Sequence, residues 1–413
     1  MSAPHPTLRF SDVIPPTRCS LADHHAPSRL HLTYNARAAI YQLLLSLPRE
    51  GRNTILLPAY HCTSLVEPVI RAGLQPVFYG IRPDFSIDTE DLRAKISSAV
   101  ALTVVVHYFG FPTPLEAVKS IAQENGSLLL EDCAHSFMSR SDGAFIGHAA
   151  DFAVFSYYKF APSLAGGGLA INSPQFSLKV SSSQVSLRER VVIAKRLFEQ
   201  AANNSPRNPV SAAFLWLDGL RSAPQESGSN ANSELAPSAF VDDPYLFRED
   251  LAKSAMPGIC QRIIESSNWM ENSRRRRENY ETLSRLLENH RAVRSVFPKL
   301  TGDVVPWAYP ILLDDRPAHE RKLKALGVPF FTFGEILHPS LAQTNDAART
   351  NAEAISRQLM LLPVHAQLEI EDIRAYVRSL TQYLDSPKST EENSAPEFSS
   401  LSPTASATEA ARR

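Results

Sequence analysis

Cysteine is scarce in this chain. Its 413 residues include four cysteines, which stand far apart at Cys19, Cys62, Cys133 and Cys260. No pair has the C-x-x-C spacing of a zinc site, and so few scattered cysteines do not form the framework of a disulfide-rich domain. The pattern argues against both classes and against a metal site, and it favours a reducing compartment. We therefore expect a cytoplasmic protein.

Long apolar runs and an excess of charge of one sign are also missing. No stretch approaches the roughly 18 apolar residues of a membrane span, and the N-terminus lacks the apolar core of a secretion signal. The 42 lysines and arginines nearly balance the 43 acidic residues. This balance provides no general attraction for nucleic acid or an anionic membrane. We expect a soluble protein that binds neither.

A glycine-rich dinucleotide motif is the third absence. No G-x-G-x-x-G follows an early predicted strand, which argues against a dinucleotide-binding dehydrogenase. Hydrophobic residues make up 44% of the chain and charged residues 21%. These values are near the globular average, so we expect a sizeable core divided between about two domains.

Two apolar runs within residues 127–172 end in chemically active side chains. The first ends in Asp132, with His135 three residues later, and the second ends in Ser156, with Lys159 and a triple glycine after it. A lysine that forms a Schiff base and a carboxylate that keeps a pyridinium nitrogen protonated are what a pyridoxal 5′-phosphate (PLP) site requires. The stretch around the lysine is otherwise uncharged, which argues against an ordinary surface lysine.

Apolar runs alternate with helical patterns in the first half of the chain. Strands that are apolar on both faces and separated by helices predict an α/β fold, with a mainly parallel sheet flanked by helices. Ligands bind at the carboxyl ends of such strands, where Tyr60, His61, His107, Asp132 and Lys159 fall. Strands are predicted at 54–57, 75–79, 101–106, 128–130, 152–155 and 168–171, and helices at 64–72, 90–97 and 114–125.

A helix that starts after Asn35 precedes the first of these strands. Asn35 is a plausible N-cap, and alanines and leucines follow at helical spacing. The free N–H groups of the first turn and the helix dipole offer a seat for phosphate. The alternative is an ordinary amphipathic helix without a ligand.

The composition divides the chain into four parts. Residues 1–30 are predicted to be an N-terminal arm, and 31–245 a large domain whose segment 176–245 is less regular. Residues 246–385 are predicted to be a smaller α+β domain, and 386–413 a disordered tail with almost no apolar residues. Helices are predicted at 186–203, 211–220, 248–290, 316–326 and 369–384, strands at 307–313 and 360–364, and a mobile loop at 221–238.

Residues 34–384 resemble the DegT-type nucleotide-sugar aminotransferases, which have fold type I of the PLP enzymes. Several motifs in order are more specific than any one alone. The resemblance implies an aminotransferase that moves an amino group, with glutamate as donor, to a keto sugar carried on a nucleotide, and it implies a homodimer. The matching phrases are LLPAYHCTSLVEPVIRAGLQPVFYGI, VVVHYFGFP, LLLEDCAHS, GHAADFAVFSYYKFAPSLAGGGLAIN and LMLLPVH.

The resemblance also implies a role for each site residue. Lys159 would be the Schiff-base lysine and the base that moves the substrate proton, and Asp132 would pair with the pyridine nitrogen. His135 would lie near the phenolic oxygen of the cofactor. The phosphate would be held by Ser156 and by backbone amides at Ala36 and Arg37.

Two departures from the family pattern leave alternatives open. Lys159 stands three residues after Ser156, a shorter spacing than in many family members. The aromatic residue that packs on the ring face falls at Cys62, so Tyr60 or His61 would have to take its role. One alternative is a sugar dehydratase-like enzyme, although such enzymes tend to have histidine in place of the lysine. The other is a non-catalytic PLP-binding paralogue.

The groups that would bind the substrate are not ranked by the sequence. Arg37, His338, the loop 221–238 and the arginine run 274–277 are all candidates to face a nucleotide diphosphate. A run of charges on a helix more commonly forms a solvated face.

Overall fold

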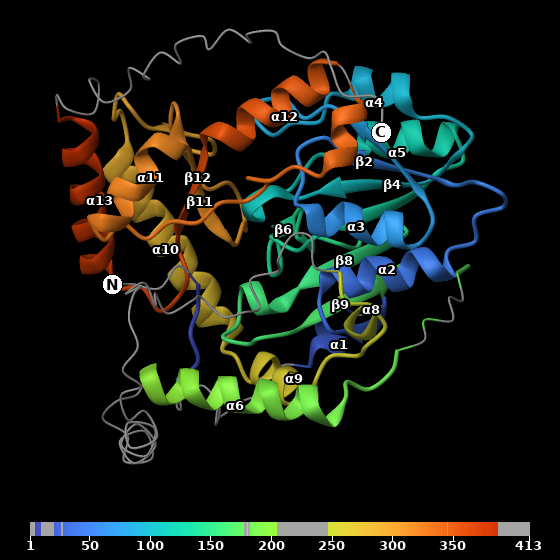
Figure 1. The fold of residues 1–413 in the computed structure, drawn as a ribbon, viewed down its shortest axis with the longest axis horizontal. Coiled ribbons are helices and arrows are strands. Elements are labelled where there is room, and N and C mark those ends of the chain that lie inside the picture. Colours follow the sequence, from blue (N-terminus) through green and yellow to red (C-terminus); the bar gives the residue numbers. More distant parts are fainter. Residues whose placement is uncertain are drawn as a thin grey trace, which may run out of the picture.

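The computed structural model describes residues 5–9, 20–25, 28–176, 180, 182–204, 247–344 and 346–386. A seven-stranded sheet forms the larger unit (Figure 1). Its order is β1-β9-β8-β5-β4-β2-β3, in which the five strands from β8 to β3 are parallel. The strands are β1 (Arg29–Thr33), β2 (Thr54–Pro58), β3 (Gln75–Tyr79), β4 (Val100–Val106), β5 (Leu128–Asp132), β8 (Phe152–Ser156) and β9 (Gly167–Ile171), and the pair β6 (Arg140–Ser141) and β7 (Ala144–Phe145) lies outside this sheet.

The strands of the parallel part are buried on both faces. Every residue of β2, β4 and β8 is buried, as expected for strands covered by helices on both faces. The predicted α/β fold is therefore confirmed, and Asn35 is the N-cap of α2, where its side chain accepts a hydrogen bond from the Ala38 N–H at 2.9 Å. The helices of this unit are α1 (Leu21–His24), α2 (Ala36–Ser46), α3 (Thr63–Arg71), α4 (Thr89–Lys95), α5 (Glu116–Glu124), α6 (Leu187–Asn204), α8 (Glu249–Ala252) and α9 (Gly258–Glu265).

Strand β1 was not predicted from the sequence. It pairs antiparallel with β9, which is itself antiparallel to β8, so both strands extend one edge of the parallel sheet. Only the last residue of β1 is fully buried. A short edge strand with one neighbour has a weak apolar pattern, which is why the segment looked like the end of an arm.

A three-stranded antiparallel sheet forms the smaller unit, on the left of Figure 1. Helices α10 and α13 pack together beside it, and α11 packs against α12. Helix α12 was not predicted from its largely polar sequence. The elements are β10 (Arg294–Ser295), β11 (Ala308–Leu312), β12 (Leu359–Pro363), α10 (Trp269–Leu287), α11 (Arg316–Ala325), α12 (Ala347–Gln358) and α13 (Ile370–Leu384).

The single long helix predicted from 248 to 290 is wrong. The chain forms α8, α9 and α10 instead. Pro257 directly precedes α9 in an extended conformation, and a residue before or at a proline tends to leave a helix. Asn268 then caps α10, accepting a hydrogen bond from the Glu271 N–H at 3.1 Å.

Several other predictions fall outside the described residues, namely the helix at 211–220, the loop at 221–238 and the tail after residue 386. The helix predicted at 186–203 is α6. Among the parts of the chain that the structure describes, no helix combines the length and the apolar composition needed to cross a bilayer.

The two units are joined through the segment that leads into β11. The Trp307 N–H donates to the Phe109 carbonyl at 2.8 Å, and the Ser139 hydroxyl donates to the Gly110 carbonyl at 2.8 Å. The same hydroxyl accepts from the Val305 N–H at 2.9 Å. Phe109 and Gly110 come shortly after the end of β4, so this segment lies at the carboxyl ends of the parallel strands. One continuous apolar core runs through both units.

Candidate active site

Strand β5 ends in two acids that face opposite sides of the sheet, because side chains alternate along a strand. Asp132 accepts a hydrogen bond from the Ala134 N–H at 2.9 Å. Burial raises the pKa of Asp132, while that N–H and the charges of Lys159 and His107 oppose the rise. A carboxylate in this position is best stabilised by a further cationic partner, such as a protonated ring nitrogen.

Lys159 ends η3 (Tyr157–Lys159), a short turn that follows β8. Its Nζ atom lies 4.6 Å from the centre of the Trp307 ring and 5.9 Å from that of Phe333. The charge of Lys159 acts on both Asp132 and His135. The structure thus brings together the acid, the histidine and the lysine expected from the sequence, at the ends of β5 and β8.

His135 is held between aromatic rings. Its imidazole stacks on Trp307 with ring centres 4.0 Å apart and planes at 19°, and Phe109 lies parallel at 5.9 Å. The Phe109 N–H points at Nδ1 over a long 3.5 Å. Burial and the Lys159 charge hold the pKa of His135 well below its usual range. The ring is therefore neutral, and its Nε2 atom is the one that carries the proton.

Trp307 and Phe333 were not identified as site residues from the sequence. Both rings lie beside the Lys159 amine, and Phe333 in turn contacts His135 and Phe109; we call these four rings the aromatic box. Trp307 begins the WAYPILL phrase, and an aromatic at the start of a strand is equally typical of an ordinary core position. No local pattern pointed to the site, because both residues reach it from the smaller unit.

Tyr60 and His61 differ in their relation to the box. The Tyr60 hydroxyl donates to the Phe333 carbonyl, so Tyr60 holds the backbone that carries one ring of the box. His61 is not brought to the lysine: its ring stacks on Phe78 at 5.1 Å, and its Nε2 atom accepts from the His338 N–H at 3.1 Å. His338, the donor of this hydrogen bond, therefore lies beside His61 and is likewise not brought to the lysine.

A second corner of the site lies where β8 and β9 meet α2. Ser156 and Gly167 are opposite residues of an antiparallel pair, so their side-chain positions share one face. A Cβ on Gly167 would lie 2.2 Å from the Asn35 carbonyl carbon and 2.6 Å from the Ala36 nitrogen. That face is therefore the one against which the first turn of α2 packs.

The polar groups of this corner suit a phosphate. The buried Ser156 hydroxyl has no hydrogen-bond partner among the residues that the structure describes, and a buried polar atom without a partner calls for an explanation. The first turn of α2, which packs on this face, carries backbone N–H groups, and the Arg37 side chain of that turn is 8% exposed. A helix N-terminus with an adjacent hydroxyl is a common anion site.

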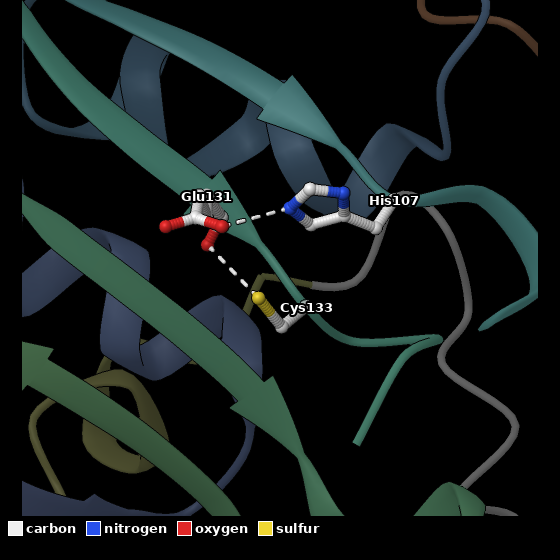
Figure 2. A group of neighbouring side chains, drawn as sticks. All are labelled: His107, Glu131 and Cys133. Carbon is white, nitrogen blue, oxygen red and sulfur yellow. Dashed lines mark hydrogen bonds and ion pairs between the residues drawn. The ribbon is translucent and has the colours of Figure 1, made fainter. Parts of the chain in front are cut away.

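Glu131, on the other face of β5, was missed by the sequence analysis. Figure 2 shows it beside His107 and Cys133. It accepts hydrogen bonds from His107 Nε2 at 3.0 Å and from the N–H groups of Gly147, Ala149 and Ala150 at 3.1, 2.8 and 2.8 Å. The acidic pair in LLLEDCAHS was the only signal for it.

This group has ligand-like chemistry but is fully used in holding the fold. The Thr113 N–H donates to His107 Nδ1 at 2.9 Å, so Nε2 carries the proton that goes to Glu131. Burial raises the pKa of Cys133 well above its usual range, which keeps the thiol protonated. Neither imidazole nitrogen nor the thiol is thus available to a cation, and we assign the group a structural role.

Comparison with known families agrees with these observations. Residues 21–185 match the model of the DegT/DnrJ/EryC1/StrS aminotransferase family, which confirms the resemblance carried by the sequence motifs. Relatives with assigned activities include GDP-perosamine synthase of Vibrio cholerae, 23% identical over 37% of this chain and 39% of that protein. Another is dTDP-3-amino-3,4,6-trideoxy-alpha-D-glucose transaminase of Micromonospora megalomicea subsp. nigra, 32% identical over 24% of this chain and 28% of that protein.

The matched stretches thus span well under half of these relatives. Among solved structures, PseC of Helicobacter pylori, an aminotransferase of pseudoaminic acid biosynthesis, superposes with a TM-score of 0.64 at 18% identity over 92% of this chain and 98% of that one. 3-Amino-5-hydroxybenzoic acid synthase superposes with a TM-score of 0.62 at 17% identity over 88% of each chain. These similarities extend the common fold to both units of the molecule.

Proposed function

We propose that this chain, whose residues 21–185 match a family of aminotransferases, is itself a PLP-dependent aminotransferase. The observation that carries the proposal is the convergence of Asp132, His135 and Lys159 at the ends of two neighbouring parallel strands. Each supplies a group that such a reaction needs: a carboxylate, a neutral imidazole and a primary amine.

The residues present fit the cofactor. The amine of Lys159 would hold its aldehyde carbon, and Asp132 would hold its ring nitrogen in the protonated form. The Ser156 hydroxyl, without a partner in the described chain, and the first turn of α2 would hold its phosphate. When bound, PLP supplies an electron sink for the bond that breaks at the substrate carbon.

The chain's own residues would handle positioning and proton transfer. Lys159 Nζ would take the substrate proton and return it at the neighbouring carbon, because it is the primary amine nearest to the reacting atoms. His135 would donate a hydrogen bond from Nε2 without carrying charge. The faces of Trp307 and Phe333 would exclude water from the amine.

We propose an amino donor such as glutamate and a keto sugar carried on a nucleotide as acceptor. The names of the relatives, which act on GDP- and dTDP-linked sugars, support this substrate class. A homodimer in the cytoplasm is part of the same proposal, as is a division of the chain near residue 385. The division expected at residue 245 moves to the start of α10, because α8 packs on α2 and Ile264 of α9 lies against Gly166 in the larger unit. Sedimentation of the purified chain at twice its monomer mass is the expected result for a dimer.

Replacing Lys159 with alanine tests the proposal directly. The wild-type protein incubated with PLP should show absorbance near the visible edge, and Lys159→Ala should lose it together with all transamination, because no amine remains to hold the aldehyde. Lys119→Ala, on the exposed face of α5, is the matched control and should keep the band. A visible band in Lys159→Ala that survives gel filtration would contradict the assignment.

The reaction with glutamate separates the proposal from the two alternatives. Glutamate should bleach the visible band of the wild-type enzyme, and a screen of keto-sugar nucleotides should then find one that restores it. A non-catalytic binder would keep an unchanged spectrum. A dehydratase-like enzyme would release a deoxygenated sugar without transferring nitrogen.

A further inference from the structure

The arginine run 274–277 on α10 does not form one charged face. Arg274 is exposed and pairs with Glu271 at 2.7 Å. Arg275 and Arg277 donate to backbone carbonyls of the smaller unit, including Leu368 at 2.8 Å and Val304 at 2.7 Å. Arg276 is 1% exposed. A run of four helical residues covers most of the circumference, so one member turns into the core.

Arg276 holds backbone from both sides of the site. Its Nη2 atom donates to the carbonyls of Lys159 at 3.3 Å and Phe160 at 3.5 Å. Its Nη1 atom donates to the carbonyls of Pro306 at 3.2 Å and Trp307 at 3.3 Å. The guanidinium thus joins the turn that ends in the lysine to the segment that presents the tryptophan.

The Arg276 guanidinium is itself held in place by Asn272. Asn272, one helical turn earlier, accepts from Nε at 2.7 Å and donates from its amide to the Phe160 carbonyl at 2.9 Å. The guanidinium also lies 4.7 Å from the centre of the Phe160 ring. Among the described residues no carboxylate lies within ion-pair distance of it, so backbone oxygens, the Asn272 amide oxygen and one ring face stabilise the guanidinium.

We propose that Arg276 is the positioning residue for the catalytic lysine: by holding the Lys159 and Trp307 carbonyls with one guanidinium, it sets the direction of the Lys159 amine against the Trp307 ring. The inference rests on the proposed function of Lys159. Within this turn the N–H groups of Phe160 and Ala161 donate to the Tyr157 carbonyl, and Arg276 holds two carbonyls further along, those of Lys159 and Phe160. The planar fork of arginine reaches carbonyls on both sides, and a lysine ammonium cannot.

The test compares Arg276→Met, Arg276→Lys and Asn272→Ala with the wild type and with Arg274→Met, the exposed neighbour on the same helix. PLP is titrated into each purified full-length protein, the adduct is reduced with borohydride, and the modified Lys159 peptide is quantified by mass spectrometry. We expect about ten- to a hundredfold weaker PLP retention in Arg276→Met, as for the loss of charged hydrogen bonds. Arg276→Lys should fail to restore it, and Arg274→Met should match the wild type.

A second readout separates positioning from general stability. The pH midpoint of the colour change in the PLP-loaded protein should shift in Arg276→Lys and Asn272→Ala, because the environment of the lysine nitrogen changes while the fold remains. If Arg276→Met does not fold, these two variants decide the question. Wild-type behaviour of both in retention and pH midpoint would overturn the inference. Failure of the wild type to form the Lys159 adduct would instead overturn the proposed function.

Discussion

At the scale of single residues, Glu131 and Asp132 are adjacent acids with opposite electrostatic surroundings. Burial alone would raise the pKa of Glu131, but the His107 imidazole and the N–H groups of Ala149 and Ala150 outweigh it and hold that pKa below its ordinary value. For Asp132 burial prevails and the pKa is raised. Glu131 therefore stabilises the fold, whereas the proposed function gives Asp132 the ring nitrogen of the cofactor as its partner.

Replacing Glu131 with glutamine should destabilise the protein by about 2–4 kcal/mol at neutral pH, because an amide cannot accept all the hydrogen bonds that the carboxylate accepts. Chemical denaturation measures the loss, with the exposed Glu116→Gln on α5 as control. The effect depends on pH. A carboxyl whose pKa is lower in the folded state stabilises the fold above its unfolded pKa, near 4.3, and loses that contribution as the pH falls further.

The difference in stability between the wild type and Glu131→Gln should therefore shrink as the pH falls below about 4. A difference that stays constant from neutral pH into this acid range would show that Glu131 acts through packing and not through its charge.

At the scale of secondary-structure elements, the contact between β9 and the first turn of α2 shapes the corner around Ser156 that we propose as the phosphate site. Gly167 allows the two backbones to touch, because any Cβ there would overlap the Asn35 carbonyl. This contact places the Ser156 hydroxyl on the same side of the sheet as the first turn of the helix.

Gly167→Ala should push α2 away from β9. We expect a loss of about 1–3 kcal/mol in the free energy of unfolding, typical of overpacking, and weaker retention of PLP and of inorganic phosphate. Gly258→Ala, at the start of α9 with open space around its Cβ position, should change neither quantity. Wild-type phosphate affinity in a folded Gly167→Ala protein would place the phosphate site elsewhere.

The sequence was informative wherever a local pattern decides the structure. The buried strands, the Asn35 cap and the strand-end positions of Asp132 and Lys159 follow from apolar runs and their ends. The inward position of Arg276 could not be predicted in this way, since a run of arginines has no apolar periodicity. Trp307 belongs to the smaller unit and reaches the box only when the two units pack together, which no local pattern reveals. Strand β1 depends on pairing with β9, which follows much later in the sequence.

At the scale of the whole molecule, the smaller unit completes the site that the larger unit begins. Ser139 is central to the junction, since its hydroxyl bonds to Gly110 in one unit and to Val305 in the segment that enters the other. Gly110 has φ of +109° and lies against the Val305 backbone, so the two chains touch directly there. The orientation of Trp307 over the lysine thus depends on the junction.

Ser139→Ala should loosen this junction. Leaving the Gly110 carbonyl and the Val305 N–H without their partner is expected to destabilise the protein by about 1–3 kcal/mol in chemical denaturation. The transamination activity of the protein that remains folded should also fall, because the aromatic box loses its alignment while the core persists. The exposed Ser120→Ala on α5 serves as control. Equal losses of activity in Ser139→Ala and Ser120→Ala would mean that the junction does not affect the site.

The pairing of β1 with β9 has a consequence for the order in which the protein forms. During synthesis, residues 29–33 leave the ribosome long before residues 167–171, so the edge of the sheet and the corner around Ser156 must wait for the later strand. Contacts between segments so distant along the chain close slowly. Under the proposed function, PLP would have no complete binding site on the early chain, and its binding would select molecules whose sheet is already formed.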